Sequence, residues 1–129
     1  MAQKQWTSQA DWQTWTADAS IDLTTAPGSV LLDAGQPSGT LTSPAYQAAG
    51  WVTWSHLEFD LSLPTGANVY ARVKVASTEG GLVGAAWSSY MDGQAMNGTV
   101  QFNLGVEYLN SPPGDPGDWI QIELTLVRA

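Results

Sequence analysis

The chain of 129 residues contains no cysteine. Without thiols it cannot form a disulfide scaffold, use a cysteine nucleophile or bind zinc through cysteine. It has a single histidine, His56, which excludes sites built from several histidines and leaves one candidate base for a catalytic triad. No Gly-x-Ser-x-Gly turn is present to hold a nucleophilic serine, so we interpret His56 as a surface residue beside Glu58. We therefore expect a protein that is not an enzyme and has no cofactor.

Positive charge is scarce as well. Four lysines and arginines stand against 12 aspartates and glutamates, which gives a formal net charge of −8. A nucleic-acid-binding protein needs a basic surface, and an anionic membrane would repel this chain. No apolar stretch approaches the roughly 18 residues of a membrane span, and the residues after Met1 do not form a secretion signal. We expect no nucleic-acid or membrane partner, and synthesis in a cytoplasm.

What is present is a pattern of strands and turns. The 13 glycines and seven prolines fall between apolar runs. Residues 51–63, 68–77 and 118–128 alternate apolar and polar side chains, which predicts strands with one buried face. The turn at residues 63–67 predicts a hairpin that joins the first two. Shorter strands are predicted at 20–24, 29–33, 39–43, 86–90, 99–104 and 106–109. Eight or nine strands of this kind predict an all-β antiparallel sandwich.

The apolar faces of the three alternating segments predict the core. Its expected members are Leu57, Phe59, Leu61, Val69, Val73, Val75, Ile120, Ile122, Leu124 and Leu126. Ahead of the strands, Ser8 can cap a short helix because Trp12, Trp15 and Ala19 follow at helical spacing. We expect at most this one short helix, near residues 9–16. Residues 1–19 are interpreted as an N-terminal arm and residues 20–129 as the sandwich.

Two pairs of carboxylates could in principle support catalysis or metal binding. Glu58 and Asp60 lie about 7 Å apart on one predicted strand face, a spacing that inverting glycosidases use. Arg72 and Lys74 on the next strand could neutralise them, so we interpret the set as a solvated charge cluster. Asp115 and Asp118, in a loop rich in glycine and proline, could hold calcium. No metal site is predicted, because their spacing matches no EF-hand and aspartate is common in turns.

Tryptophan is unusually frequent, with seven in the chain. A small sandwich core needs one or two, and tryptophan is enriched at interfaces. Trp51, Trp87 and Trp119 are predicted to lie in the core. The N-terminal three can serve as core, as a protein interface or as a sugar platform, in that order of preference. We take Trp6, Trp12 and Trp15 as the candidate partner-binding residues.

The order of several short segments resembles a known family. These segments are APGSVLL (26–32), SGTLTSPAY (38–46), WVTWSHL (51–57), LPTGANV (63–69), YARVKVAS (70–77), WSSY (87–90) and DWIQIELTL (118–126). They resemble the small jelly-roll β-sandwich modules, galactose-binding-like in shape, of bacteriophage structural proteins and secreted bacterial proteins. Two features depart from the pattern: the segment from Arg72 to Ser77 is lengthened, and Trp119 replaces the usual closing tyrosine.

This resemblance implies a jelly roll without shared catalytic residues. The function that it implies is that of a non-enzymatic virion structural protein, with a capsid decoration (cement) protein preferred. Its partners would be the major capsid protein and further copies of itself, with a trimer favoured, and its location the capsid surface. A tail or fibre module and a carbohydrate-binding module are the alternatives. Residues 3–7 are expected to add as an edge strand to a neighbouring subunit.

Overall fold

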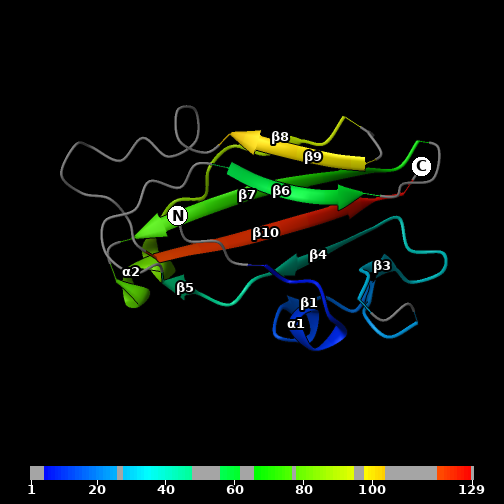
Figure 1. The fold of residues 1–129 in the computed structure, drawn as a ribbon, viewed down its shortest axis with the longest axis horizontal. Coiled ribbons are helices and arrows are strands. Elements are labelled where there is room, and N and C mark those ends of the chain that lie inside the picture. Colours follow the sequence, from blue (N-terminus) through cyan, green and yellow to red (C-terminus); the bar gives the residue numbers. More distant parts are fainter. Residues whose placement is uncertain are drawn as a thin grey trace.

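The computed structural model describes residues 5–25, 28–47, 56–61, 66–76, 78–94, 98–103 and 119–128. These residues form antiparallel sheets and two short helices, so the all-β prediction is confirmed (Figure 1). The elements are α1 (Gln9–Gln13), β1 (Thr16–Ala17), β2 (Ile21–Asp22), β3 (Leu31–Leu32), β4 (Ser38–Thr42), β5 (Tyr46–Gln47), β6 (His56–Leu61), β7 (Asn68–Ala76), α2 (Glu79–Gly84), β8 (Met91–Asp92), β9 (Gly98–Asn103) and β10 (Trp119–Val127).

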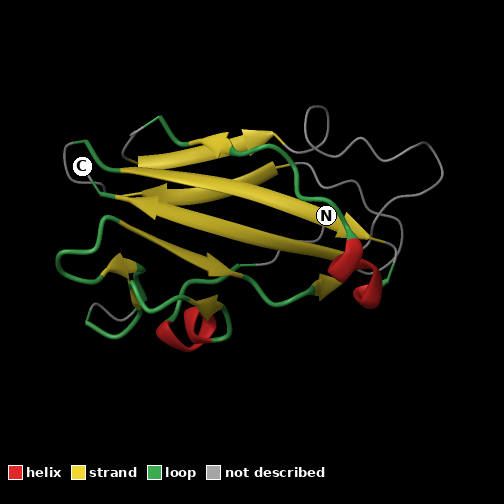
Figure 2. Cartoon of the chain, turned by 180° about the vertical axis from the view of Figure 1, so that it is seen from behind, coloured by secondary structure: helices red, strands yellow, loops and turns green. Residues whose placement is uncertain are grey.

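The largest sheet has six strands in the order β1-β4-β10-β7-β8, with β5 also paired to β10. Its two longest strands, β7 and β10, pair over their whole length, from Trp119 opposite Ala76 to Val127 opposite Asn68 (Figure 2). Alternation along both strands gives the sheet two unlike faces. One face is aliphatic and buried, and the other is polar. We call the second one the outer face.

A ladder of β6 and β9 covers the buried face. Phe59 on β6 and Phe102 on β9 meet edge to face with ring centroids 5.9 Å apart, and both belong to the core. The small β2–β3 ladder packs on β4, where Gly39 gives it room: a Cβ at Gly39 would lie 2.7 Å from Cδ1 of Ile21. The described strands are thus layered around one core. Their jelly-roll connectivity stays a prediction.

The predicted core is largely confirmed and is larger than expected. Half of the predicted residues are fully buried, and the other half are partly buried. Most of the remaining members come from shorter elements, which the alternating strands could not indicate, whereas Ala71 lies on the predicted apolar face of residues 68–77. The buried hydrophobic residues outside the predicted core are Trp15, Ile21, Leu41, Ala67, Ala71, Leu82, Met91 and Phe102.

The predicted hairpin between residues 51–63 and 68–77 is wrong. β6 pairs with β9, whereas β7 pairs with β10 and β8. The apolar faces of β6 and β7 meet across the core, so the two strands must belong to different layers. The composition of residues 63–67, with Pro64 and Gly66, is compatible with either arrangement and therefore did not decide which strands pair.

Three smaller expectations also need correction. Ten described strands replace the expected eight or nine, because β1, β5 and β8 are two residues long and gave no alternating pattern. The expected strand 106–109 lies outside the described residues. The expected strand 86–90 is irregular, since the Ser88 hydroxyl takes the place of a ladder carbonyl and accepts from the Val73 amide. A second helix, α2, begins after the N-cap Thr78. Its three glycines weakened the helical signal, while buried Leu82 anchors it by packing.

The expected N-terminal helix is confirmed as α1. Ser8 caps it, and Ser8 and Asp11 form a reciprocal capping box. The predicted arm of residues 1–19 packs continuously with the predicted sandwich in the described residues. β1 pairs with β4, and Trp15 lies in the same core as the strands. In the part of the chain that the structure describes, neither helix is long and apolar enough to cross a membrane.

Candidate functional site

The N-terminal tryptophan cluster, formed by Trp6, Trp12 and Trp15, is the site that the sequence singled out. Trp15 lies at its centre, with ring centroids 5.2 Å from Trp6 at an angle of 87° and 5.2 Å from Trp12 at 52°. Trp15 is only 5% exposed, whereas Trp6 and Trp12 are partly buried and pack against the core. The cluster therefore has a buried centre and two rings that also reach solvent.

Local structure fixes these rings in place. The Asp11 carboxylate accepts hydrogen bonds from the backbone amides of Thr7 and Ser8, and the backbone amide of Asp11 donates to the Ser8 hydroxyl in return. The Gln9 side chain donates to the carbonyl of Leu23, which ties α1 to the loop after β2. The indole Nε1 of Trp15 is buried and has no hydrogen-bond partner in the described structure. An unpaired buried donor costs stability, so ring packing rather than polar contact holds Trp15.

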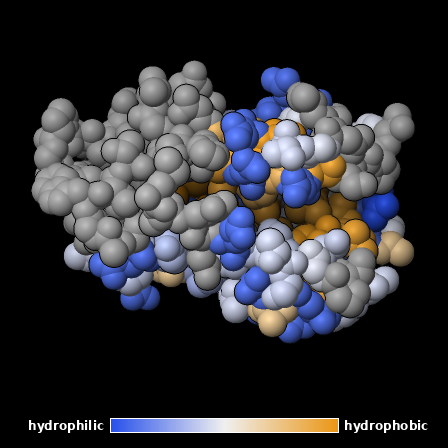
Figure 3. All heavy atoms as spheres, viewed as in Figure 1, coloured by the Kyte–Doolittle hydropathy of each residue, from blue (hydrophilic) through white to orange (hydrophobic). Residues whose placement is uncertain are grey.

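The sequence offered three roles for this cluster: core, protein interface or sugar platform. Because Trp15 is buried, it belongs to the core. A flat sugar platform made by Trp12 and Trp15 is contradicted, because the two rings are tilted and Trp15 is covered. Trp6 and Trp12 retain exposed area that a protein partner could bury. Figure 3 shows hydrophobic side chains that reach the surface between the β6–β9 ladder and the part of the chain with α1 and β3.

The paired carboxylates on β6 are engaged within their own ladder. Glu58 accepts from the Gln101 amide at 2.7 Å, and Asp60 accepts from the Thr99 hydroxyl at 2.8 Å. Arg72, which was expected to neutralise them, instead pairs with Glu123 on β10. That expectation failed together with the hairpin on which it depended. The contacts of Glu58 and Asp60 are those of cross-strand pairs on a polar strand face.

Elsewhere, aspartates organise turns. Asp22 accepts hydrogen bonds from the amides and hydroxyls of Thr24 and Thr25, and the Thr25 hydroxyl contributes most to lowering the pKa of Asp22 to about 2. The Asn68 side chain, followed by the Gln94 amide, lowers the pKa of Asp92. A general acid near neutral pH needs a raised pKa, so both shifts run opposite to acid catalysis.

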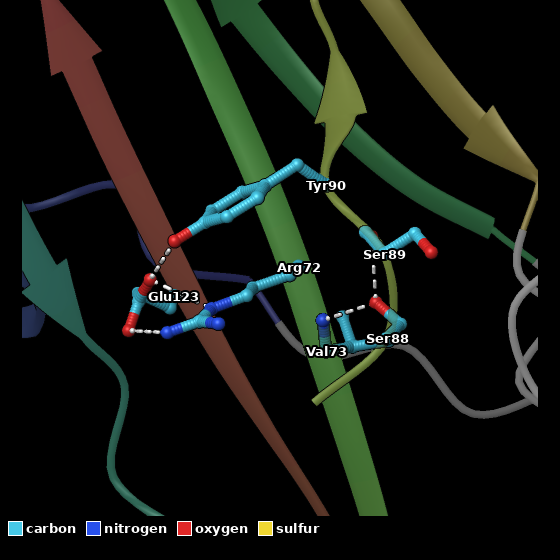
Figure 4. Close-up of polar contacts among 6 residues, drawn as sticks. All are labelled: Arg72, Val73, Ser88, Ser89, Tyr90 and Glu123. Carbon is cyan, nitrogen blue, oxygen red and sulfur yellow. Dashed lines mark hydrogen bonds and ion pairs between the residues drawn. The ribbon is translucent and has the colours of Figure 1, made fainter. Parts of the chain in front are cut away.

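A second cluster, on the outer face of the six-stranded sheet, was missed by the sequence analysis. This outer-face cluster consists of Arg72, Lys74, Trp87, Tyr90 and Glu123. The Arg72 guanidinium carbon lies 4.8 Å from the ring centroid of Trp87 and 4.8 Å from that of Tyr90. Figure 4 shows the side chains of Arg72 and Tyr90 both reaching toward Glu123.

The two described tryptophans that were predicted to be core residues, Trp87 and Trp119, are only partly buried. Trp87 packs on the cations of the outer face, and Trp119 follows the outer-face alternation of β10. Alternation did place Arg72 and Lys74 on the polar face of one predicted strand and Glu123 on the polar face of another, without indicating that the two strands are neighbours. It carried no information about Trp87 and Tyr90, whose positions depend on the irregular segment between α2 and β8.

Several predicted residues lie outside what the structure describes. They are Trp51, Asp115 and Asp118, together with the side chain of His56. Across the described ranges, no group of three or more histidine, aspartate or glutamate side chains is arranged to hold a metal ion.

No protein-family model, no curated protein and no solved structure matches this chain. The resemblance to jelly-roll modules of bacteriophages stays a prediction that rests on the segments quoted above.

Proposed function

We propose that this chain is a non-enzymatic structural protein of a bacteriophage virion, and specifically a capsid decoration protein. Its partners would be the major capsid protein and further copies of itself, with a trimer preferred, on the outer surface of the capsid. The acidic composition suits a protein that faces away from packaged DNA. A tail or fibre position is the alternative within the same class.

The observation that carries this proposal is the N-terminal tryptophan cluster. Its centre is rigid, because Trp15 is buried, while Trp6 and Trp12 hold large rings at the surface. Rings fixed in this way lose little freedom on binding, and aromatic anchors supply much of the energy at protein interfaces. Figure 3 also shows hydrophobic side chains at the surface between the β6–β9 ladder and the part of the chain with α1 and β3, which a larger contact could include.

The mode of contact differs from the edge-strand addition that the sequence suggested. Gln5–Thr7 are not in a strand, and the amide of Thr7 already donates to Asp11. The described edge strands of the six-stranded sheet, β1, β5 and β8, are each two residues long, and short edge strands discourage strand addition. We therefore propose contact through side chains of α1 and of the tryptophan cluster.

Binding to expanded capsids of the phage that encodes the chain tests this proposal. Trp12→Ser removes an anchoring ring, and we expect it to weaken co-sedimentation with capsids by at least about tenfold. Gln13→Arg adds a bulky charge at an exposed position of α1 without removing any core contact, and it should also weaken binding. Val83→Ser on α2, where Val83 is 87% exposed, is the matched control and should bind normally.

Self-association is measured on the same proteins by light scattering. Like charges oppose the packing of identical acidic subunits, so the trimer should tighten as salt screens them. Unimpaired capsid binding by both Trp12→Ser and Gln13→Arg would reject the proposed surface. No binding of the unaltered protein to capsids, with binding to purified tails, would place it in the tail instead.

A further inference from the structure

The outer-face cluster lies on the side of the six-stranded sheet opposite the core. Arg72 and Lys74 project from β7, and strand register places Glu123 and Gln121 of β10 beside them. After α2 the chain returns along the side of β7 that does not face β10, where the Ser88 amide donates to the Val73 carbonyl at 2.7 Å. This return segment carries Trp87 and Tyr90 to the two cations (Figure 4).

Arg72 is held rigidly within this cluster. Its Nε and Nη2 atoms donate to the two Glu123 oxygens at 2.8 and 3.0 Å, while the rings of Trp87 and Tyr90 each lie 4.8 Å away. The Tyr90 hydroxyl is 3.4 Å from Glu123 and completes the arrangement. Nη1 of Arg72 has no hydrogen-bond partner among the described residues. The guanidinium is therefore positioned in advance and still has donors to offer.

Lys74, unlike Arg72, has no carboxylate partner in the described structure. Its ammonium lies 4.6 Å from the centroid of the Trp87 ring, and no described carboxylate is within ion-pair distance of it. This is unusual in a chain where 12 acidic residues face four basic ones. Arg72 and Lys74 together outweigh Glu123, so the cluster has an excess of positive charge on a protein of net charge −8. An anionic group of a ligand would find here two of the four basic side chains of the protein.

We infer that the outer-face cluster binds an oligosaccharide that carries carboxylate groups. Lys74 and Nη1 of Arg72 would receive the sugar carboxylate. Tyr90, 52% exposed and with Arg72 against its ring, offers an aromatic surface for the C–H groups of a sugar ring. Gln121 donates through Nε2 to the Ser43 carbonyl, which leaves its Oε1 as an acceptor for a sugar hydroxyl.

An acidic peptide fits this face less well. Extended peptides bind sheets by adding main-chain hydrogen bonds at an edge. β10 is paired on both sides, and the outer side of β7 is occupied by β8, Ser88 and Gly93. Recognition on this face must come from side chains alone. Fixed charges, amides and rings are the groups that recognise sugars.

Titration with carboxylated oligosaccharides tests the inference. The probes are trigalacturonate and 3′-sialyllactose, with methyl-esterified trigalacturonate and lactose as their neutral counterparts and hexaglutamate as an acidic peptide. We expect the two acidic sugars to bind with a Kd near about 1 mM in calorimetry, and the neutral sugars at least about tenfold more weakly. In nuclear magnetic resonance spectra, the indole N–H signal of Trp87 should shift while that of buried Trp15 stays unchanged.

Variants locate the site and separate charge from position. Lys74→Gln and Tyr90→Leu should each weaken binding of the acidic sugar by about tenfold. Arg128→Gln makes the same change in net charge as Lys74→Gln, but it follows the far end of β10 and should leave binding unchanged. Absence of binding by both acidic sugars, equal binding of the neutral sugars, equal binding of hexaglutamate, or indifference to Lys74→Gln would each overturn the inference. Capsid binding is a separate measurement that uses other residues, so either idea can fail without the other.

Discussion

The two aromatic clusters of this protein use the same side chains in opposite ways. In the N-terminal tryptophan cluster, rings pack on rings, and Trp15 is 5% exposed within the core. In the outer-face cluster, rings pack on cations, and Tyr90 is 52% exposed. Tryptophan content alone cannot separate the two cases, because one ring type supplies both a large apolar surface and a face that attracts cations.

The difference follows from what the fold places opposite each ring. Trp15 precedes β1, which pairs with β4 beside fully buried Leu41, so its ring meets aliphatic side chains. The ring of Trp87 lies against the cations of Arg72 and Lys74 on β7, which point away from the core. Burial makes the first ring a determinant of stability, whereas exposure keeps the second available for contact. Stability measurements should therefore separate the two clusters.

The largest expected effect is that of Trp15→Ala. Removal of a buried tryptophan leaves a cavity, and we expect the free energy of unfolding to fall by about 3–5 kcal/mol. Trp87→Ala should lower it by only about 1 kcal/mol, because cation–π contacts near the surface are weak. Urea unfolding followed by circular dichroism measures both. Equal losses in the two variants would contradict the distinction between the clusters.

Trp15→Phe refines this test. Phenylalanine keeps part of the buried ring and removes the unpaired Nε1 donor. Because a buried donor without a partner costs about 1–3 kcal/mol, this variant should lose clearly less stability than Trp15→Ala. A loss as large as that of Trp15→Ala would mean that Nε1 has a favourable contact that its geometry does not indicate.

The two faces of the sheet can be compared on a single strand. Leu124 is buried between Leu41 and Ala71, whereas its neighbour Thr125 lies on the outer face opposite Tyr70. Leu124→Ala should cost about 2–5 kcal/mol, and Thr125→Ala less than about 1 kcal/mol. Chemical denaturation of both variants at one pH checks the assignment of faces. A larger cost for Thr125→Ala would mean that the outer face is covered by packing.

The alternation of apolar and polar residues predicted the two long strands of the six-stranded sheet correctly. The predicted strands 68–77 and 118–128 correspond to β7 and β10, and their faces are as expected. Period-two alternation follows directly from strand geometry, so it reports which side chains share a face. It does not report which strand lies alongside. The partner of β6 is β9, about 40 residues away in sequence, and only packing across the core selects it.

In the candidate sites, too, the sequence did not indicate which distant segments come together. Aromatic residues close together in sequence, such as Trp12 and Trp15, could be predicted to meet because they are three residues apart, with Trp12 on α1 and Trp15 just after its end. The outer-face cluster joins Arg72, Tyr90 and Glu123 from three segments. One of these segments is irregular, and a serine side chain replaces a ladder carbonyl there. No periodic signal marks such a path, so the sequence could not indicate what its rings would touch.

A double-mutant cycle sharpens the account of the outer-face cluster. We expect Arg72→Met and Tyr90→Leu to show a coupling energy of about 0.5–1 kcal/mol, the value of a cation–π contact near the surface. Unfolding midpoints of the two single variants and of the double variant measure this coupling. Val83→Ser combined with Arg72→Met is the control pair and should be additive, since no contact joins these residues in the described structure. Additive behaviour of Arg72→Met with Tyr90→Leu would mean that the stacking is not energetically significant.

The smallest effect expected is an acid sensitivity on the N-terminal side. Hydrogen bonds led by the Thr25 hydroxyl lower the pKa of Asp22 from 3.8 to about 2 in the folded protein. Above about pH 5 the Asp22 carboxylate is charged in both the folded and the unfolded chain, and its contribution to stability is complete. As the pH falls from about 5 toward 2, the unfolded chain takes up this proton before the folded one does, so the contribution is lost.

Asp22→Asn removes this titration, so the stability difference between the two proteins should shrink as the pH falls through that range. Urea midpoints at several pH values between 5 and 2 measure it. The Gln9 side chain ties α1 to the carbonyl of Leu23, which lies between Asp22 and the threonines that Asp22 binds, so hydrogen exchange should show that the amides of α1 open with acid before those of β7. Earlier opening of β7, or a constant difference between the two proteins, would rule out Asp22 as the acid-sensitive group of the N-terminal side.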